Sequence, residues 1–176
     1  YSTAGYGELN IDGKKYVDVY KSDGLAKAVK LEGYTIFMTA GPWNNGASIT
    51  EYTMPTSVAS NVTIEGVKEA ILNMNNLGEV SGANNLTIDG ITVNWNGNIY
   101  SGFTHSTGHV YKNITFNGAF FCWNQSARFE DCAFNLNANQ YIWTYGCNVD
   151  FERCTFNCVD GKGILIYNEG TDVTVN

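Results

Sequence analysis

Proline and positive charge are both scarce in this sequence. Only 2 of the 176 residues are proline, so the breaks between structural elements must come from glycine and asparagine. Lysine and arginine total 10 against 17 aspartates and glutamates, which gives a formal net charge of −7. A protein that binds nucleic acid needs clustered cations to neutralise phosphates, and the sequence contains no basic patch. The composition therefore excludes nucleic acid as a partner.

Long apolar runs are also missing. No stretch approaches the roughly 20 residues of a membrane span, and the start (Tyr1-Ser2-Thr3-Ala4) does not have the pattern of a signal peptide. Hydrophobic residues nevertheless make up 44% of the chain and charged residues only 15%, which is too apolar for a disordered segment. We expect a soluble, monomeric segment of a larger chain.

The five cysteines lie in the last third of the sequence and form no tight C-x-x-C pair. An odd number excludes complete pairing within the chain, and the spacing does not fit a zinc or redox site. We interpret them as buried free thiols that act as small apolar side chains. They are Cys122, Cys132, Cys147, Cys154 and Cys158.

The first 32 residues are predicted to form an N-terminal cap. Residues 8–20 alternate around Asp12-Gly13, a dipeptide typical of a hairpin turn. Ser22 is expected to cap a short helix that carries apolar residues at helical spacing. A cap of this kind would cover the open end of a solenoid.

A sequence repeat of about 20 residues begins at residue 61. Aligning its copies produces three apolar columns and one column of asparagine. A repeat of this length without a helix in each unit predicts a β-helix, because each coil is too small to bury its own apolar face. The fold class is therefore all-β: a right-handed parallel β-helix over residues 33–176, with a short N-terminal capping helix and an end partway through a coil. The columns are Ile88/Tyr111/Phe129/Phe151, Ile91/Ile114/Cys132/Cys154, Val93/Phe116/Phe134/Phe156 and Asn94/Asn117/Asn135/Asn157.

The asparagine column predicts a ladder of amides that hydrogen-bond to one another along the solenoid axis. The second strand of each coil also repeats. Residues 120–123, 142–145 and 164–167 align with a step of 22 residues each time.

These phrases, N-x-T-I-[ED]-G and F-E-x-C-x-F-N after the strand GYTIFMTAG, resemble the pectin-lyase-like β-helix superfamily. They are similar in particular to the repeat regions of large bacterial surface proteins. The resemblance implies a parallel β-helix with either polysaccharide-cleaving or adhesin-like roles. Its motifs are structural, so they are specific for the fold and not for the activity.

Acidic residues in one outward column raise the question of a metal site. Relatives of this fold bind calcium through stacked carboxylates, and oxygen ligands of this kind suit Ca²⁺. The alternative is a solvated strand face on which Arg128 relieves the repulsion between carboxylates. We expect no resident cofactor or metal. The weak calcium candidates are Glu130, Asp150, Glu152 and Asp172.

No catalytic constellation can be assembled from the sequence. The two histidines, His105 and His109, lie four residues apart in an expected turn, and no carboxylate pair accompanies them to act as acid and base. Cysteines in the core column would be desolvated and unreactive. No residue is therefore proposed as catalytic.

The strongest positive signal is an aromatic band on the second strand of each coil. Alternate residues of a strand face opposite ways, so one side of this strand carries large aromatic side chains outward. Long turns or the rest of a parent protein could cover the band, or the opposite strand register could turn the other two columns outward. Otherwise it is typical of a surface that engages a ligand. The expected ligand-binding residues, including a polar rim, are Phe121, Trp123, Trp143, Tyr145, Tyr167, Asn168 and Glu169.

The sequence thus predicts a binding module and not an enzyme. We expect it in a secreted or cell-surface bacterial protein, outside the cell, recognising a host or extracellular ligand. The resemblance suggests glycans or glycoproteins, immunoglobulins among them. A polysaccharide lyase or hydrolase, active or degenerate, and a structural spacer are the alternatives.

Overall fold

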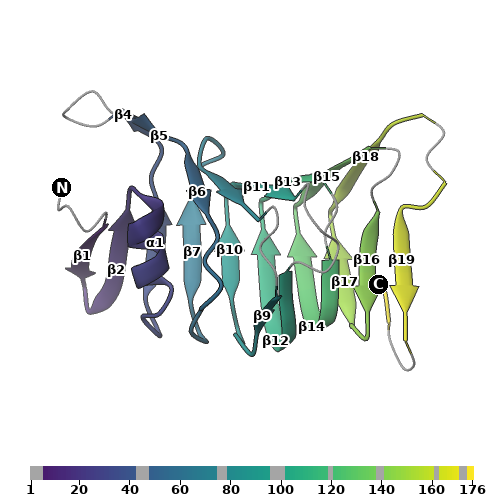
Figure 1. Ribbon diagram of the computed structural model, residues 1–176, viewed down its shortest axis with the longest axis horizontal. Helices are drawn as coiled ribbons and strands as arrows, with labels where there is room; N and C mark the ends of the chain where they lie inside the picture. The colour runs from purple at the N-terminus through teal and green to yellow at the C-terminus, as the bar shows by residue number, and fades with distance from the viewer. Residues whose placement is uncertain are drawn as a thin grey trace.

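The chain forms an elongated β-solenoid of about 6 turns, with strands making up 56% of it. The coils stack side by side along the longest axis (Figure 1). A computed structural model describes residues 6–42, 48–74, 79–95, 102–118, 121–137, 141–160, 163–170 and 174–176. The all-β prediction is confirmed, and its physical basis is the parallel stacking of in-register strands.

Most strands belong to two sheets. The larger sheet has 11 strands, which are parallel apart from the first pair. β9 (Glu79–Ser81) pairs with β12, and β17 (Val149–Glu152) pairs with β14. The other strands, in sheet order, are β1 (Tyr6–Ile11), β2 (Lys14–Val19), β3 (Thr35–Met38), β7 (Thr63–Gly66), β10 (Thr87–Asp89), β12 (Gly102–Lys112), β14 (Phe121–Glu130), β16 (Ile142–Tyr145) and β19 (Ile166–Glu169).

The second sheet has six parallel strands and supplies the opposite wall of the solenoid. A separate two-stranded antiparallel pair joins β4 (Gly41–Pro42) to β5 (Ser48–Ile49). In order, the six strands are β6 (Glu51–Thr53), β8 (Ile71–Asn73), β11 (Thr92–Trp95), β13 (Thr115–Gly118), β15 (Ala133–Leu136) and β18 (Thr155–Cys158).

The N-terminal region contains the predicted hairpin and helix. β1 and β2 pair antiparallel around Asp12 and Gly13, whose φ angles of 51° and 78° match the tight turn expected for this dipeptide. Helix α1 (Ser22–Ala28) follows and buries Leu25 and Ala28. The predicted capping role of Ser22 is wrong: the N-cap is Lys21 without a side-chain cap, and the Ser22 hydroxyl accepts the Thr53 amide N–H at 3.0 Å. The hydroxyl therefore ties the helix to β6 and not to its own first turn.

The apolar columns meet in the interior as two stacks of aromatic rings. Phe116 and Phe134 stack at 4.9 Å between ring centroids, and Phe134 and Phe156 stack at 5.2 Å. A parallel stack of Tyr111, Phe129 and Phe151 faces them edge-on, with centroids 4.9 and 5.1 Å apart along the stack. Offset and edge-to-face ring contacts of this kind add to the burial of each ring. They hold successive coils in register.

Tight turns between the two sheets explain part of the sequence repeat. Asn113, Asp131 and Arg153 occupy the same turn in successive coils with φ of 51°, 52° and 53°, and Gly90 occupies it with φ of 83°. Left-handed backbone of this kind favours glycine and asparagine. Gly90 and Asn113 fit this preference, and Asp131 and Arg153 adopt the same conformation in the following coils.

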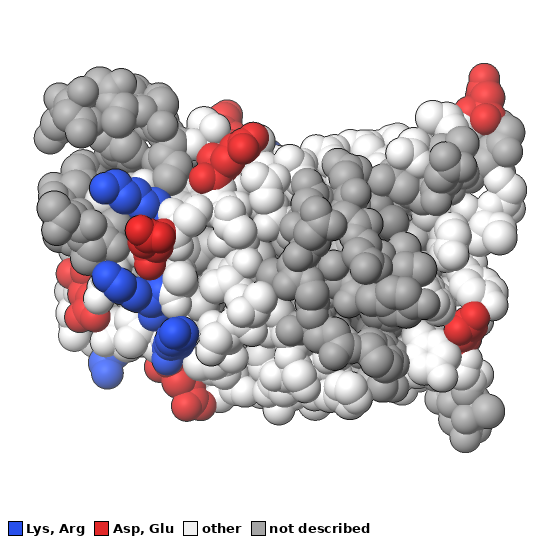
Figure 2. All heavy atoms as spheres, in the orientation of Figure 1, with Lys and Arg blue, Asp and Glu red and all other residues white. Residues whose placement is uncertain are grey.

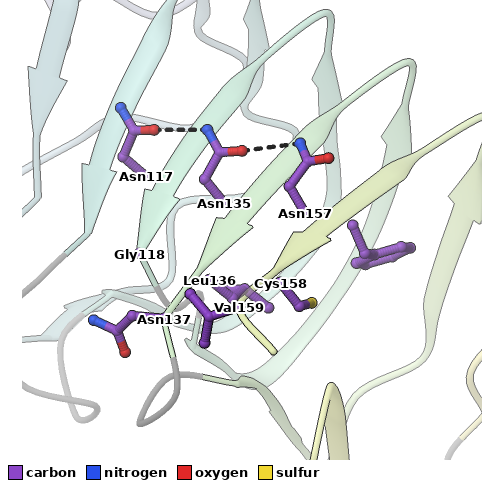
Figure 3. Close-up of a pocket in the computed structure, with 9 residues that line it drawn as sticks. Asn117, Gly118, Asn135, Leu136, Asn137, Asn157, Cys158 and Val159 are labelled. Carbon is purple, nitrogen blue, oxygen red and sulfur yellow. Dashed lines mark hydrogen bonds between the residues drawn. The ribbon is translucent and has the colours of Figure 1, made fainter. Parts of the chain in front are cut away.

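The asparagine ladder runs along the outer face of the second sheet, and the structure confirms it (Figure 3). Each amide Nδ2 donates to the Oδ1 of the preceding coil, at 3.1, 3.2, 2.9 and 2.9 Å. The ladder begins one coil earlier than predicted. Its members are Asn73, Asn94, Asn117, Asn135 and Asn157.

Charge is unevenly spread over the solenoid. On the face shown in Figure 2, the lysine and arginine side chains of the described residues gather at the N-terminal end, and the middle of that face shows none. No helix in the described part of the chain has the length and apolar character needed to cross a membrane.

Candidate functional site

An aromatic cluster lies on the outer face of β16 and β19, near the C-terminal end of the larger sheet. Ile142 and Thr144 point into the core and are fully buried. Because strand side chains alternate, Trp143 and Tyr145 point outward. We call Tyr141, Trp143, Tyr145 and Tyr167 the aromatic cluster.

The rings of the cluster are close enough to form one continuous surface. Trp143 lies 6.2 Å from Tyr167 and 6.5 Å from Tyr145 between ring centroids, and Tyr141 lies 6.0 Å from Tyr167. The side chains of Tyr145 and Tyr167 remain 41% and 40% exposed. Aromatic side chains left this exposed, side by side, are unusual unless they contact a partner.

The strand register differs from the sequence alignment by two residues. Phe121 pairs with Trp143 as expected, but Trp143 pairs with Tyr167 and not with Leu165, so the step is 24 residues and not 22. A two-residue slip leaves every side chain on its predicted face, because the strand period is two. The error therefore changed the neighbours of Trp143 without changing its orientation.

Of the other predicted binding residues, two have side chains outside the described part of the chain, one faces away from the aromatic cluster, and one, Glu169, lies beside it. The side chains of Phe121 and Trp123 lie outside the described residues, although their backbones pair with those of Trp143 and Tyr145. Asn168 pairs with Thr144 and accepts its hydroxyl at 2.7 Å, so it faces the solenoid interior and not the aromatic cluster.

Glu169 pairs with Tyr145 and lies on the aromatic side of β19. A hydrogen bond between the Tyr167 hydroxyl and the Glu169 carboxylate raises the pKa of Tyr167. The cluster thus carries one carboxylate among its described residues.

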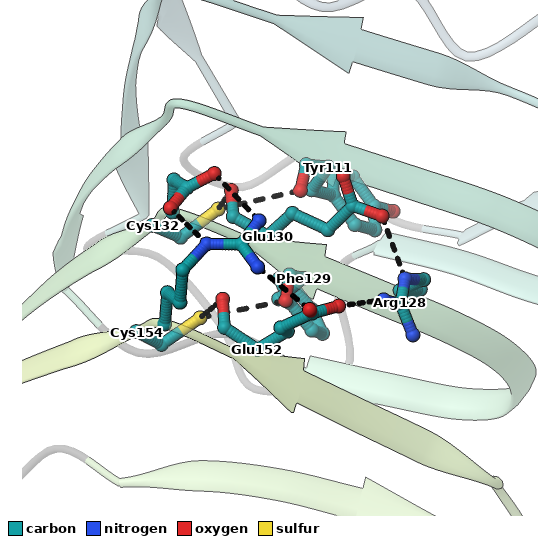
Figure 4. Close-up of polar contacts among 9 residues, drawn as sticks. Tyr111, Arg128, Phe129, Glu130, Cys132, Glu152 and Cys154 are labelled. Carbon is teal, nitrogen blue, oxygen red and sulfur yellow. Dashed lines mark hydrogen bonds and ion pairs between the residues drawn. The ribbon is translucent and has the colours of Figure 1, made fainter.

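A second polar group, the charged ladder, crosses β14 and β17 (Figure 4). Arg128 bridges two carboxylates, with Nε 2.6 Å from Glu130 and a second contact to Glu152. Arg153 contacts Glu152 at 2.6 Å and reaches both oxygens of Asp131 at 2.8 and 3.1 Å. The hydrogen bond from Arg128 lowers the pKa of Glu130, and that from Arg153 lowers the pKa of Asp131.

These contacts bear on the predicted calcium candidates. Guanidinium groups already engage the carboxylates of Glu130 and Glu152, and Asp150 accepts the Asn176 amide at 2.7 Å. Asp172 lies outside the described residues. Within the part of the chain that the structure describes, no three His, Cys, Asp or Glu side chains are arranged to hold a metal ion.

The charged ladder predicts a pH dependence of stability. Glu130 and Asp131 have depressed pKa values in the folded state. Their ionised carboxylates therefore stabilise the folded state at pH values above the ordinary carboxyl pKa of about 4. This stabilisation is lost as the pH falls through the lower folded values. We expect the melting temperature of Asp131→Asn to fall less steeply than that of the natural protein below about pH 4. Parallel curves in differential scanning fluorimetry would contradict this.

His109, Cys132 and Cys147 are buried in the core, whereas Cys154 is half-buried and Cys158 is exposed, so the prediction of buried thiols is correct only in part among the described cysteines. The His109 ring is buried, and its Nε2 donates to the Ala83 carbonyl at 2.5 Å, while Nδ1 lies 3.2 Å from the Tyr111 hydroxyl. Burial raises the pKa of the Cys132 thiol to about 12. A thiol held in this protonated form is a poor nucleophile.

Sequence reasoning missed a hollow at the ends of β13, β15 and β18. Its volume is about 660 Å³. Figure 3 shows the asparagine ladder along this hollow and Leu136, Cys158 and Val159 gathered at the strand ends. The repeat signalled the ladder, but the hollow is lined by residues from three different coils, which no local pattern brings together.

One of three comparisons with known proteins found a match, and it supports the fold. No protein-family model matches the sequence, and no curated protein sequence matches it. The structure is similar to a crystal structure from Parabacteroides merdae described as "a putative glycosyl hydrolase", with a TM-score of 0.62 and 14% sequence identity. The match covers 93% of this chain and 90% of that one. At this identity the likeness shows a common fold.

The comparison corrects one expectation. The sequence favours a protein that is not an enzyme, and the comparison contradicts this expectation, because the chain shares its fold with a protein described as a glycosyl hydrolase. The error came from arguing from the absence of known motifs, whereas an active site is defined by geometry that different motifs can supply.

Proposed function

We propose that this β-helix binds a polysaccharide across β16 and β19, on the aromatic cluster. The observation that carries the proposal is the contact of Trp143 with both Tyr145 and Tyr167, two residues that remain 41% and 40% exposed. Aromatic rings with polar tips can stack on the C–H face of a sugar while their hydroxyl groups reach its oxygens. The fold match to a protein described as a glycosyl hydrolase supports a carbohydrate ligand.

Rigidity favours this surface for binding. Trp143, Tyr145 and Tyr167 project from strands that are hydrogen-bonded to a neighbouring coil, and Ile142 and Thr144 anchor β16 in the core. A platform that is ordered before the ligand arrives loses little conformational entropy on binding. Polysaccharides of this kind are encountered outside the cell, and we propose the bacterial surface or its surroundings as the place of action.

Hydrolysis of the bound polysaccharide is the second candidate function, and the fold match favours it. Glycoside hydrolysis normally uses two carboxyl groups, one of which is protonated. Glu169 is a carboxylate at the aromatic cluster. Glu130 is held in its ionised form by Arg128 and is therefore poorly suited to act as the acid. Glu169 is the residue to test first for a catalytic role.

The binding test compares the natural protein with Trp143→Ala/Tyr167→Ala on a panel of soluble neutral and acidic polysaccharides. Removing two central aromatic contacts should weaken binding by about 30-fold or more, since an aromatic hot spot contributes roughly 2 kcal/mol. Affinity electrophoresis measures the change. Tyr34→Ala, a partly exposed tyrosine beside Lys15 at the other end of the solenoid, is the matched control.

Equal affinity of the double variant and the natural protein, with both folded, would exclude the aromatic cluster as the binding surface. The same panel is assayed for newly released reducing ends. Loss of release in Glu169→Gln with retained binding would assign this carboxylate to hydrolysis, and unchanged release would remove it.

A further inference from the structure

A second surface of the solenoid has a different chemistry from the aromatic cluster. It is the outer face of β8, β11, β13, β15 and β18, which we call the neutral face. Its outward side chains form two columns. One is the asparagine ladder, and the other contains Ile71, Thr92, Thr115, Ala133 and Thr155.

The asparagine column is a regular array of hydrogen-bonding groups, and Thr92, Thr115 and Thr155 add hydroxyl groups beside three of its rungs, of which the Thr92 hydroxyl already donates to the Lys68 carbonyl at 2.8 Å. Successive coils are about 4.8 Å apart, and the threonine and asparagine of one strand, two residues apart, are separated by about 6.7 Å. A carboxamide has two N–H donors and an oxygen with two lone pairs, and the ladder uses one of each. Every rung therefore has a donor and an acceptor left for another molecule.

This face carries no charge. None of the outward residues from β8 to β18 is acidic or basic, and the first charged residue, Glu51, lies on β6. The larger sheet differs: Glu65, Asp89, Lys112 and Glu130 follow one another there in a single column. An uncharged array selects an uncharged partner, because a charged one would lose hydration without gaining an ion pair.

The hollow of about 660 Å³ lies at the C-terminal end of this array. Amides of Asn117, Asn135 and Asn157 line it together with the exposed side chain of Val159, and the nearly buried Leu136 lies at its edge (Figure 3). Neutral amides beside apolar groups match a sugar, which offers hydroxyl groups on its rim and C–H groups on its faces.

We propose that the neutral face binds a segment of an uncharged polysaccharide, which follows the asparagine ladder along the solenoid axis and ends in the hollow. The inference deepens the proposed function, on which it rests for the ligand class: it adds a second contact surface and restricts the ligand to neutral glycans. The repeat of the array is comparable in size with one sugar unit, so successive rungs can meet successive residues of the polymer.

The test places bulk on the face without breaking the ladder. Thr115→Arg/Thr155→Arg should lower the affinity for neutral polysaccharides by about 10-fold or more, the effect of roughly 1.4 kcal/mol. Asn157→Ala removes the amide beside the hollow and should lower the affinity for neutral polysaccharides by a smaller factor. Thr63→Arg/Thr87→Arg places the same side chains outward on the larger sheet and serves as the control.

The outcomes separate this inference from the proposed function. Loss of affinity in Thr115→Arg/Thr155→Arg with a normal melting temperature, and natural affinity in the control, support the neutral face. Natural affinity in Thr115→Arg/Thr155→Arg overturns it, as does an equal loss in the control. If Trp143→Ala/Tyr167→Ala loses binding in the same experiment, the proposed function stands even where this inference fails. Preference for acidic over neutral polysaccharides would also overturn it.

Discussion

Replacing Phe134 by alanine is expected to destabilise the protein by about 4 kcal/mol, as for other fully buried phenylalanines. The Phe134 ring is 0% exposed and stacks on Phe116 and Phe156. It also meets Phe129 and Phe151 edge-on at 5.4 and 5.8 Å between centroids. The cavity left by alanine would therefore break contacts on four sides. Urea unfolding followed by tryptophan fluorescence measures the loss.

Phe156→Ala is the matched control, because it belongs to the same column. Its ring is only partly buried and stacks on Phe134 at 5.2 Å. We expect Phe156→Ala to lower the free energy of unfolding clearly less than Phe134→Ala does. Equal losses for the two variants would show that column position does not matter, and would argue against the stacked core.

Gly90→Ala is expected to lower the free energy of unfolding by about 3 kcal/mol, because two effects act together. Gly90 has a φ of 83°, a conformation that costs an alanine roughly 1–2 kcal/mol. A Cβ at this position would lie 2.7 Å from the carbonyl oxygen of Gly66 in the preceding coil. Backbone cannot move aside as a side chain can, and overpacking of this kind costs about 1–3 kcal/mol.

Gly82→Ala separates the two effects. Gly82 has a similar φ of 75°, but nothing lies within 4 Å of an added Cβ. It should show the conformational cost alone, so its melting temperature should lie between those of the natural protein and Gly90→Ala. A loss for Gly82→Ala as large as that for Gly90→Ala would show that close coil packing contributes nothing at Gly90.

The repeat made the fold predictable. Parallel stacking places equivalent residues of successive coils over one another, so a column in an alignment becomes a contact in space. Phe116, Phe134 and Phe156 stack for this reason, and so do the asparagines of the ladder. The turn at Asp12 and Gly13 could also be predicted from the sequence, because its conformation is set by local residues.

Contacts between distant segments could not be predicted in the same way. The Ser22 hydroxyl accepts from Thr53, 31 residues away, and not from its own helix. Tyr167 lies beside Trp143 because the last coil takes two residues more than the alignment allowed. Arg128 and Arg153 share the carboxylate of Glu152, which links two neighbouring coils.

The sequence alone determined the solenoid and the identity of the inward columns of its repeat, because a strand period of two and a coil period of about 20 residues are properties of the chain itself. The structure then decided that Trp143 and Tyr145 point outward, since Ile142 and Thr144 are the buried residues of that strand. The tertiary structure decided which rings meet, where the hollow lies, and which carboxylates are held by arginine. Those features depend on the lengths of the turns and on side chains from different coils, and no local pattern specifies how such parts come together.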